Sequence, residues 1–252
     1  MVWVQVPPRT PIMSSLEDIL GGAPPPPKVP RIIASGEEFR LLDQPEPPET
    51  IIARNMRRYF HNPWTMVEDR VIYTLDQTDV LQPVKPFPNE PWLELIAGRW
   101  VSEAMLALFK SRRMTITWLM IFLHLWLGMF REGAAIFFVS DKEEKSDELV
   151  KRAEFIYDHI PAEAMLKPAK KSSYCYLEFP GLNSYIQGVP QGADQLRQYT
   201  ASAIFADEFA FWPKARETFM ASKPTIDGGG KFTCISSPME GFFKELCFDL
   251  IR

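Results

Sequence analysis

The chain has 252 residues, of which 46% are hydrophobic and 24% charged, a composition typical of a folded globular protein. Its formal net charge of -4 provides no overall basic field, so any contact with nucleic acid would depend on a local patch. The cysteines Cys175, Cys234 and Cys247 are odd in number and lack metal-ligand spacing, which predicts a reducing cytoplasmic environment and no cysteine chemistry.

Proline sets the N-terminal segment apart from the rest of the chain. Residues 1–50 are dense in proline, including the run Pro24–Pro27, and they lack apolar periodicity. Such a segment buries too little surface to offset its ordering entropy, so we predict an extended or disordered arm. Residues 51–90 form a transitional lead-in, with a helix predicted around Ile51–Tyr59 and no firm assignment at Val71–Leu75.

Residues 91–252 alternate between apolar runs typical of strands and segments with helical spacing. This alternation predicts βαβ units, and therefore an α/β domain with a mostly parallel central sheet flanked by helices. The predicted strands are Met105–Lys110, Ala134–Ser140, Tyr174–Phe179, Tyr185–Val189, Ser202–Asp207 and Lys231–Ser236. The predicted helices are Trp92–Ala104, Thr117–Phe130 and Lys142–His159, and Ser140 with Glu143 has the spacing of a capping box before the last one.

The second of these helices lies in an uncharged stretch, Met114–Phe130. The stretch is shorter than the roughly 20 apolar residues of a membrane span, and His124 lies in its middle. Arginines flank it on both sides and give no orientation bias. We therefore predict a helix buried within a large core, with no membrane contact.

A polar loop, Lys110–Thr117, joins the first predicted strand to this helix. A P-loop needs a flexible turn, backbone N–H groups aimed at phosphate, a lysine, and a final Ser or Thr for magnesium. With Thr117 in that last position, Thr115 replaces the usual glycine and Ile116 replaces the usual lysine. Lys110 has a long flexible stem and could reach a phosphate from the other end of the loop. Further charge comes from Arg112 and Arg113, although an ordinary polar turn is the alternative.

Two adjacent carboxylates, Asp207 and Glu208, follow the predicted strand Ser202–Asp207. In ATPases of this architecture the first carboxylate holds magnesium through water, and the second polarises the water that attacks the γ-phosphate. An exposed turn is the alternative. The order of the two features, a loop with Lys and Thr followed about 90 residues later by the acidic strand end, favours the ATPase interpretation.

Small hydroxyl residues, Ser236 and Ser237, end the last predicted strand. Beside a γ-phosphate they could sense its presence and relay the change to the following segment, Met239–Leu246. A strand that simply stops at Pro238 is the alternative.

These segments resemble three motifs of large terminases from tailed bacteriophages. Lys110–Met114 resembles Walker A, Ala206–Ala210 resembles Walker B, and Ile235–Pro238 resembles the coupling motif. Gly192–Ala201 also looks like that family. The resemblance covers Pro91 to Arg252 and implies a P-loop NTPase domain of the RecA-like (ASCE) class that hydrolyses ATP with Mg²⁺.

The resemblance also implies roles for particular residues. Some terminases carry a deviant Walker A with its lysine at the start of the loop, as Lys110 is here. Thr117 would ligate Mg²⁺ with support from Asp207, and Glu208 would be the catalytic base. Arg197 would reach into a neighbouring subunit's site and stabilise charge on the transferring phosphoryl group, with an ordinary surface arginine as the alternative. The implied nucleotide contacts are Lys110, Ser111, Arg112, Arg113, Met114, Thr115, Ile116, Thr117, Ser236 and Ser237.

Partners follow from the same resemblance. They are double-stranded DNA, the capsid portal and the small terminase subunit, in the cytoplasm of the host cell. The chain would form a homo-oligomeric ring when assembled and be monomeric when isolated. In the family an RNase H-like nuclease domain follows the coupling motif, and since this sequence stops at Arg252 we expect no nuclease activity from it.

Two other functions are compatible with the same residues. The altered loop could belong to a nucleotide-binding or assembly module that does not hydrolyse ATP. A related ATPase of the helicase or primase type would share the same core, although the sequence leaves no room for a second motor domain of that type. ATP turnover separates the first of these from the motor.

Overall fold

The computed structural model describes residues 50–111, 114–192, 196 and 200–249. Most of the predicted arm, residues 1–49, lies outside the described residues, as do Arg112, Arg113 and Arg197.

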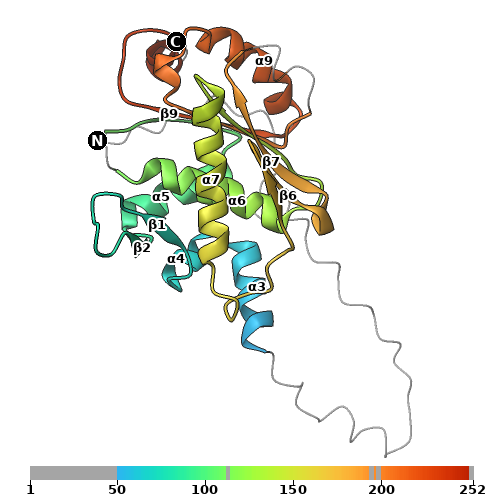
Figure 1. Ribbon diagram of the computed structural model, residues 1–252. Helices are drawn as coiled ribbons and strands as arrows, with labels where there is room; N and C mark the ends of the chain where they lie inside the picture. Colours follow the sequence, from blue (N-terminus) through green and yellow to red (C-terminus); the bar gives the residue numbers. More distant parts are fainter. Residues whose placement is uncertain (1–49, 112–113, 193–195, 197–199, 250–252) are drawn as a thin grey trace, which may run out of the picture.

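The centre of the fold is a seven-stranded sheet in the order β3-β9-β8-β4-β7-β6-β5 (Figure 1). Its first five strands in that order are parallel, and β6 and β5 add an antiparallel edge. The predicted α/β class with a mostly parallel sheet is therefore confirmed. The strands are β3 (Met105–Phe109), β4 (Ala135–Ser140), β5 (Lys171–Ser173), β6 (Tyr176–Phe179), β7 (Ser184–Pro190), β8 (Ala203–Asp207) and β9 (Lys231–Ser236).

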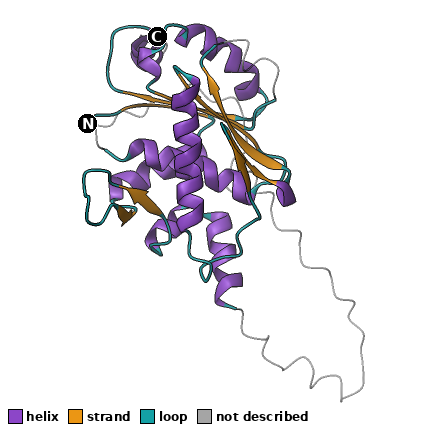
Figure 2. Ribbon diagram, viewed as in Figure 1, coloured by secondary structure: helices purple, strands orange, loops and turns teal. Residues whose placement is uncertain are grey.

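Helices cover both faces of this sheet (Figure 2). One face packs into the larger hydrophobic cluster with α5 (Pro91–Ser102), α6 (Ile116–Phe130) and α7 (Glu143–His159). The other face packs into a second cluster with α9 (Ala215–Asp227), α10 (Phe242–Lys244) and the π-helical turn η3 (Glu245–Asp249). Short 3-10 turns, η1 (Pro180–Leu182) and η2 (Phe209–Phe211), follow β6 and β8.

The predicted central helix is buried on nearly all sides. In α6 the side chains from Leu119 to Trp126 are all buried, so the apolar stretch forms core, as predicted. None of the helices in the described part of the chain combines the length and apolar character that a membrane span requires.

The predicted capping box at the start of α7 is wrong. Ser140 is the last residue of β4, paired with Pro190, and its hydroxyl lies 3.5 Å from the Asp141 carboxylate. Lys142 is the N-cap residue and makes no side-chain cap. The strand extends to Ser140, so its side chain is committed to the sheet, and Glu143 and Glu144 in the first turn favour the helix through the macrodipole instead.

Residues 51–90 add two helices and a hairpin to the larger cluster. The predicted helix appears as α3 (Ile51–His61), followed by α4 (Trp64–Glu68) and the hairpin β1 (Tyr73–Leu75) and β2 (Val84–Pro86). Tyr59, Trp64 and Phe87 are buried in the same cluster as α5 and α6. The Trp126 indole N–H donates to the Tyr59 carbonyl oxygen at 2.7 Å, so this segment is tied directly to the central helix.

Candidate active site

The candidate site lies where β3 and β8 end, at the carboxyl edge of the parallel strands. β9 separates these two strands and is in parallel register with both. The Lys110 backbone N–H, just past β3, donates to the Ser236 carbonyl oxygen of β9 at 2.9 Å. Loops at the carboxyl ends of parallel strands are where α/β proteins bind ligands, so the topology brings the predicted lysine loop and acidic pair to such an edge.

Lys110, Asp207 and Glu208 converge at this edge. The Lys110 Nζ is 2.6 Å from Glu208 Oε1 and 3.7 Å from Asp207 Oδ1. The side chains of Lys110 and Asp207 are only 11% and 13% exposed, whereas that of Glu208 is 43% exposed. The Lys110 ammonium is therefore enclosed between the strand ends. The Glu208 carboxylate is more exposed and can contact an incoming water or ligand.

The protonation of Asp207 is set by opposing effects. Burial raises its pKa above the usual value, while the charge of Lys110 lowers it and that of Glu208 raises it further. The Glu208 backbone N–H donates to Asp207 Oδ1 at 3.0 Å, and the Trp212 indole N–H donates to the Asp207 carbonyl oxygen at 3.1 Å. These contacts hold the acidic turn in one conformation.

Two non-glycine residues of the site have left-handed backbone conformations. Glu208 has φ of 53° and Thr115 has φ of 59°. This conformation costs most for a β-branched residue such as threonine. Thr115 occupies the loop position where the standard P-loop pattern has a glycine. Its backbone has the left-handed conformation that glycine favours, although its side chain is that of threonine.

The start of α6 has no side-chain cap among the described residues. Thr115 is its N-cap residue and makes no side-chain hydrogen bond there, and unpaired N–H groups at a helix start favour an anion. Ile116, in the position of the usual lysine, is 1% exposed and packs into the core. Thr117 is partly buried in the first helical turn, and Ser111 and Met114 are exposed and partly buried, respectively.

The structure separates the two predicted serines. Side chains alternate along β9, so Ser236 shares the face of Phe232 and Cys234 in the second cluster, away from the face that Asp207 shares with Phe205. Its hydroxyl is fully buried without a hydrogen-bond partner among the described residues. Ser237, one residue further, is partly exposed beyond the strand end.

Some oxygen donors of the kind that magnesium takes are present among these residues. The described residues contain no cluster of three or more His, Cys, Asp or Glu side chains able to hold a metal by themselves. Mg²⁺ commonly takes one or two carboxylates plus waters and substrate phosphates, and oxygen ligands are its preference. Asp207 and the Thr117 hydroxyl are the residues that would hold it.

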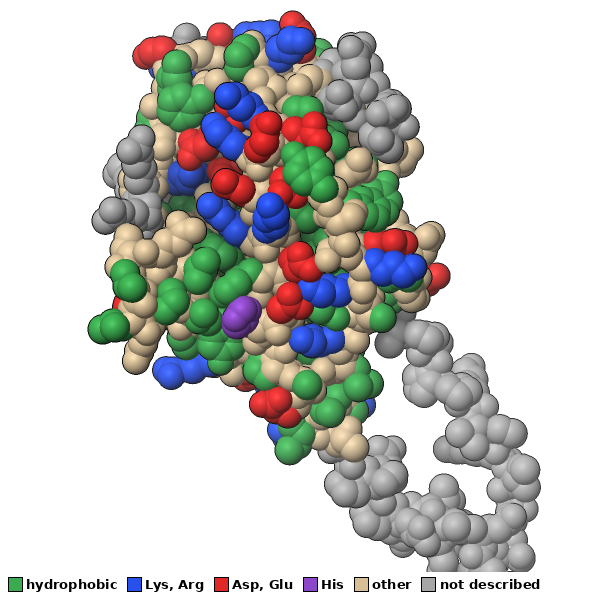
Figure 3. All heavy atoms as spheres, in the orientation of Figure 1, with side chains coloured by type: hydrophobic (Ala, Val, Ile, Leu, Met, Phe, Trp, Pro, Cys, Tyr) green, Lys and Arg blue, Asp and Glu red, His purple; other side chains and the backbone are tan. Residues whose placement is uncertain are grey.

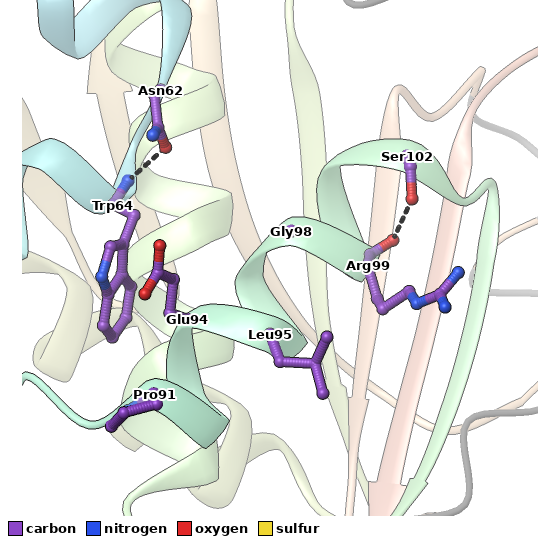
Figure 4. A pocket seen from close by; sticks show the side chains of 8 residues that line it. All are labelled: Asn62, Trp64, Pro91, Glu94, Leu95, Gly98, Arg99 and Ser102. Carbon is purple, nitrogen blue, oxygen red and sulfur yellow. Dashed lines mark hydrogen bonds between the residues drawn. The ribbon is translucent and has the colours of Figure 1, made fainter.

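A separate pocket lies at α5, away from these residues. It has a volume of about 580 Å³ and is lined by Asn62, Trp64, Pro91, Glu94, Leu95, Gly98, Arg99 and Ser102 (Figure 4). Neither the acidic pair nor any described residue of the loop lines it. The upstream aromatic Phe87 is 3% exposed and belongs to the core, so it does not present a face to a base.

The strand order β3-β9-β8-β4, with the lysine loop after β3 and the acidic pair after β8, defines a RecA-like α/β fold. No family model and no curated protein matches the chain. Among solved structures it is similar to the large terminase ATPase domain of Thermus phage P74-26, with 16% identity over 56% of this chain and 62% of that chain, and a TM-score of 0.43.

Two further solved structures are also phage large terminases. The bacteriophage HK97 large terminase is 13% identical over 67% of this chain and 37% of that chain, with a TM-score of 0.49. A large terminase from a thermophilic bacteriophage is 16% identical over 51% of this chain and 32% of that chain, with a TM-score of 0.40. The chain thus spans less than two thirds of each. At these identities the similarity concerns the fold and transfers no residue roles.

Proposed function

We propose that this domain binds ATP with Mg²⁺ at the carboxyl edge of β3 and β8 and hydrolyses it as the motor of a phage DNA-packaging machine. The observation that carries the proposal is the convergence of the Lys110 ammonium with two carboxylates 97 and 98 residues away in the chain, at 3.7 and 2.6 Å. A cation and two acids that meet at the loop leading into α6 are the kinds of group that phosphoryl transfer requires.

Each group has a role in this proposal. Lys110 neutralises phosphate charge, and the N–H groups at the start of α6 cradle the phosphates. Asp207 and Thr117 hold the metal, which draws charge from the phosphate oxygens when it is bound. Glu208, released from its ion pair with Lys110 when the lysine turns to phosphate, orients and deprotonates the attacking water.

The packaging role rests on the motif resemblance of Lys110–Met114, Ala206–Ala210 and Ile235–Pro238. Under it the domain works in a ring at the capsid portal, with the small terminase subunit, in the host cytoplasm, and moves duplex DNA. The face crossed by α7 carries intermixed acidic and basic side chains (Figure 3), with pairs such as Lys145–Asp141 and Lys151–Asp147. DNA contact in this proposal therefore uses another, more local surface.

ATP hydrolysis by two variants and their controls tests the proposal. We expect Lys110→Ala and Glu208→Gln to lower turnover at least about 100-fold, because each removes a group that acts on the transferring phosphoryl group. Glu208→Gln retains ATP binding, since its side chain keeps its size and contacts no phosphate. The matched controls Lys223→Ala and Glu217→Gln change exposed residues of α9 and should turn over ATP like the wild type. Normal turnover by Lys110→Ala would refute the lysine assignment.

A nucleotide-binding module without hydrolysis is the second candidate. Buried Ile116 in the usual lysine position and the left-handed Thr115 favour it, because both depart from an efficient P-loop. In this case the wild type binds ATP but shows no turnover above the Glu208→Gln level, also when duplex DNA is added.

A further inference from the structure

Arg152 lies in the middle of α7, beside the start of α6. Its guanidinium carbon is 5.6 Å from the centre of the Trp118 ring, within the range of a cation–π contact. Phe155, on the same helix, makes an edge contact with that ring at 5.8 Å. Trp118 belongs to the first turn of α6, directly after the lysine loop. Arg152 therefore stands next to the uncapped end of α6.

The helical layer that holds Arg152 also covers the acidic strand end. Asp207 shares its face of β8 with Ala203 and Phe205, which pack in the cluster that contains α6 and α7. Arg152 thus lies in the helical layer that packs against the face of β8 on which Asp207 stands.

Arg152 contacts an aromatic ring, whereas two lysines of the same helix form ion pairs with carboxylates. Lys151 pairs with Asp147, and Lys145 pairs with Asp141. Within the described part of the chain, no carboxylate forms an ion pair with Arg152. A guanidinium that contacts a ring face forms no hydrogen bond with it, and its N–H donors match phosphate oxygens in geometry.

We propose that Arg152 binds a phosphate of the nucleotide within the same chain, with Trp118 holding its guanidinium in position. The inference rests on the proposed function, because it assigns a further phosphate ligand to that site. Lys110 then approaches the phosphates from the end of β3, and Arg152 approaches from α7. The ligand class is a nucleoside triphosphate. Arg152 adds a second cation beside Lys110, and two cations bind the charged terminal phosphates and not the uncharged nucleoside.

Binding of ATP and of AMP to the full chain, measured by calorimetry with Mg²⁺, tests this proposal. We expect Arg152→Gln to weaken ATP binding about 10- to 100-fold, the range for losing charge-assisted hydrogen bonds, and to leave AMP binding within about twofold. Arg152→Lys should lose less, because it keeps the charge but not the planar fork of N–H donors. The matched control Lys151→Gln, one residue away and exposed, should bind both nucleotides like the wild type.

Four outcomes separate the two proposals. Wild-type affinity for ATP in Arg152→Gln overturns the assignment of Arg152 and leaves the proposed function standing. Equal weakening of ATP and AMP also overturns it, because the arginine then supports the fold. A wild type that binds no ATP overturns the proposed function and this inference together. If Arg152→Gln does not fold, Arg152→Lys decides: selective loss of ATP supports the inference, and unchanged ATP binding refutes it.

Discussion

His124 is a fully buried histidine in the centre of α6. Its Nδ1 is 2.7 Å from the Met120 carbonyl oxygen, so this nitrogen carries the hydrogen of a neutral ring. The ring stacks on Phe205 with centroids 5.4 Å apart and meets the edge of Trp100 at 5.0 Å. Burial lowers its pKa to about 3, because a charged imidazolium would lose its hydration.

The burial of His124 makes the free energy of unfolding depend on pH. The unfolded chain takes up a proton at His124 near its usual pKa of about 6.5, whereas the folded chain does so only near about 3. The free energy of unfolding should therefore fall as the pH drops below 6.5, by up to about 1.4 kcal/mol per pH unit from this group. Urea unfolding at pH 7, 6 and 5 measures the slope.

Replacing the histidine isolates its contribution. His124→Gln removes the titrating group, so its stability should vary less between pH 7 and pH 5 than that of the wild type. The control His61→Gln, at an exposed position on α3, should keep the wild-type slope. A slope in His124→Gln equal to that of the wild type would show that other groups dominate.

At the scale of elements, Lys231 joins the end of α5 to β9. Its Nζ donates to the carbonyl oxygens of Trp100, Val101 and Glu103 at 2.9, 3.0 and 3.0 Å. The Trp100 indole N–H in turn donates to the Thr233 hydroxyl at 3.0 Å. A cation at these last carbonyls is also favoured by the helix dipole. β9, which lies between β3 and β8, is thereby anchored to α5, the helix that precedes β3.

We expect Lys231→Met to lower the free energy of unfolding by about 2–4 kcal/mol, because it leaves buried carbonyl groups without a donor. The control Lys223→Met, at an exposed position on α9, should change it by less than about 0.5 kcal/mol. Chemical denaturation of both variants gives the comparison. An equal effect in the two variants would mean that the anchor contributes nothing specific.

At the scale of the whole molecule, the proposed ring makes each site a shared one. Arg197 lies outside the described residues, and its predicted role is to complete a neighbour's site. Arg197→Ala and Glu208→Gln should each be inactive alone. In an equal mixture about a quarter of the interfaces would combine an intact Glu208 with an intact Arg197, so ATPase activity should partly return.

This recovery should grow with protein concentration, because it requires assembly. Mixing Arg197→Ala with Lys110→Ala provides a second pair with the same logic. If mixtures stay inactive at concentrations where the wild type turns over ATP, Arg197 does not act across subunits.

Sequence reasoning identified the strands and helices that carry the site, since their apolar periods are local. β8 with its acidic end and the buried α6 appear where the patterns predict them, and β3 ends at Phe109, one residue before the predicted strand end at Lys110. It missed the short edge strand β5, whose residues are all exposed, and α9, where Pro224 and small polar residues obscure the helical period. Arg152 gave no signal, because it is one of several charged residues on a mixed-charge helix.

The sequence by itself determined the class of fold, and it showed that a lysine loop follows one predicted strand and an acidic pair follows another. Strand and helix periods, and the residues at strand ends, can be recognised from short stretches of the chain. Only the tertiary structure decided that β9 lies between β3 and β8, that Ser236 faces away from Asp207, and that Arg152 meets Trp118. These depend on strand order and helix packing, which arise from contacts between segments far apart in the chain.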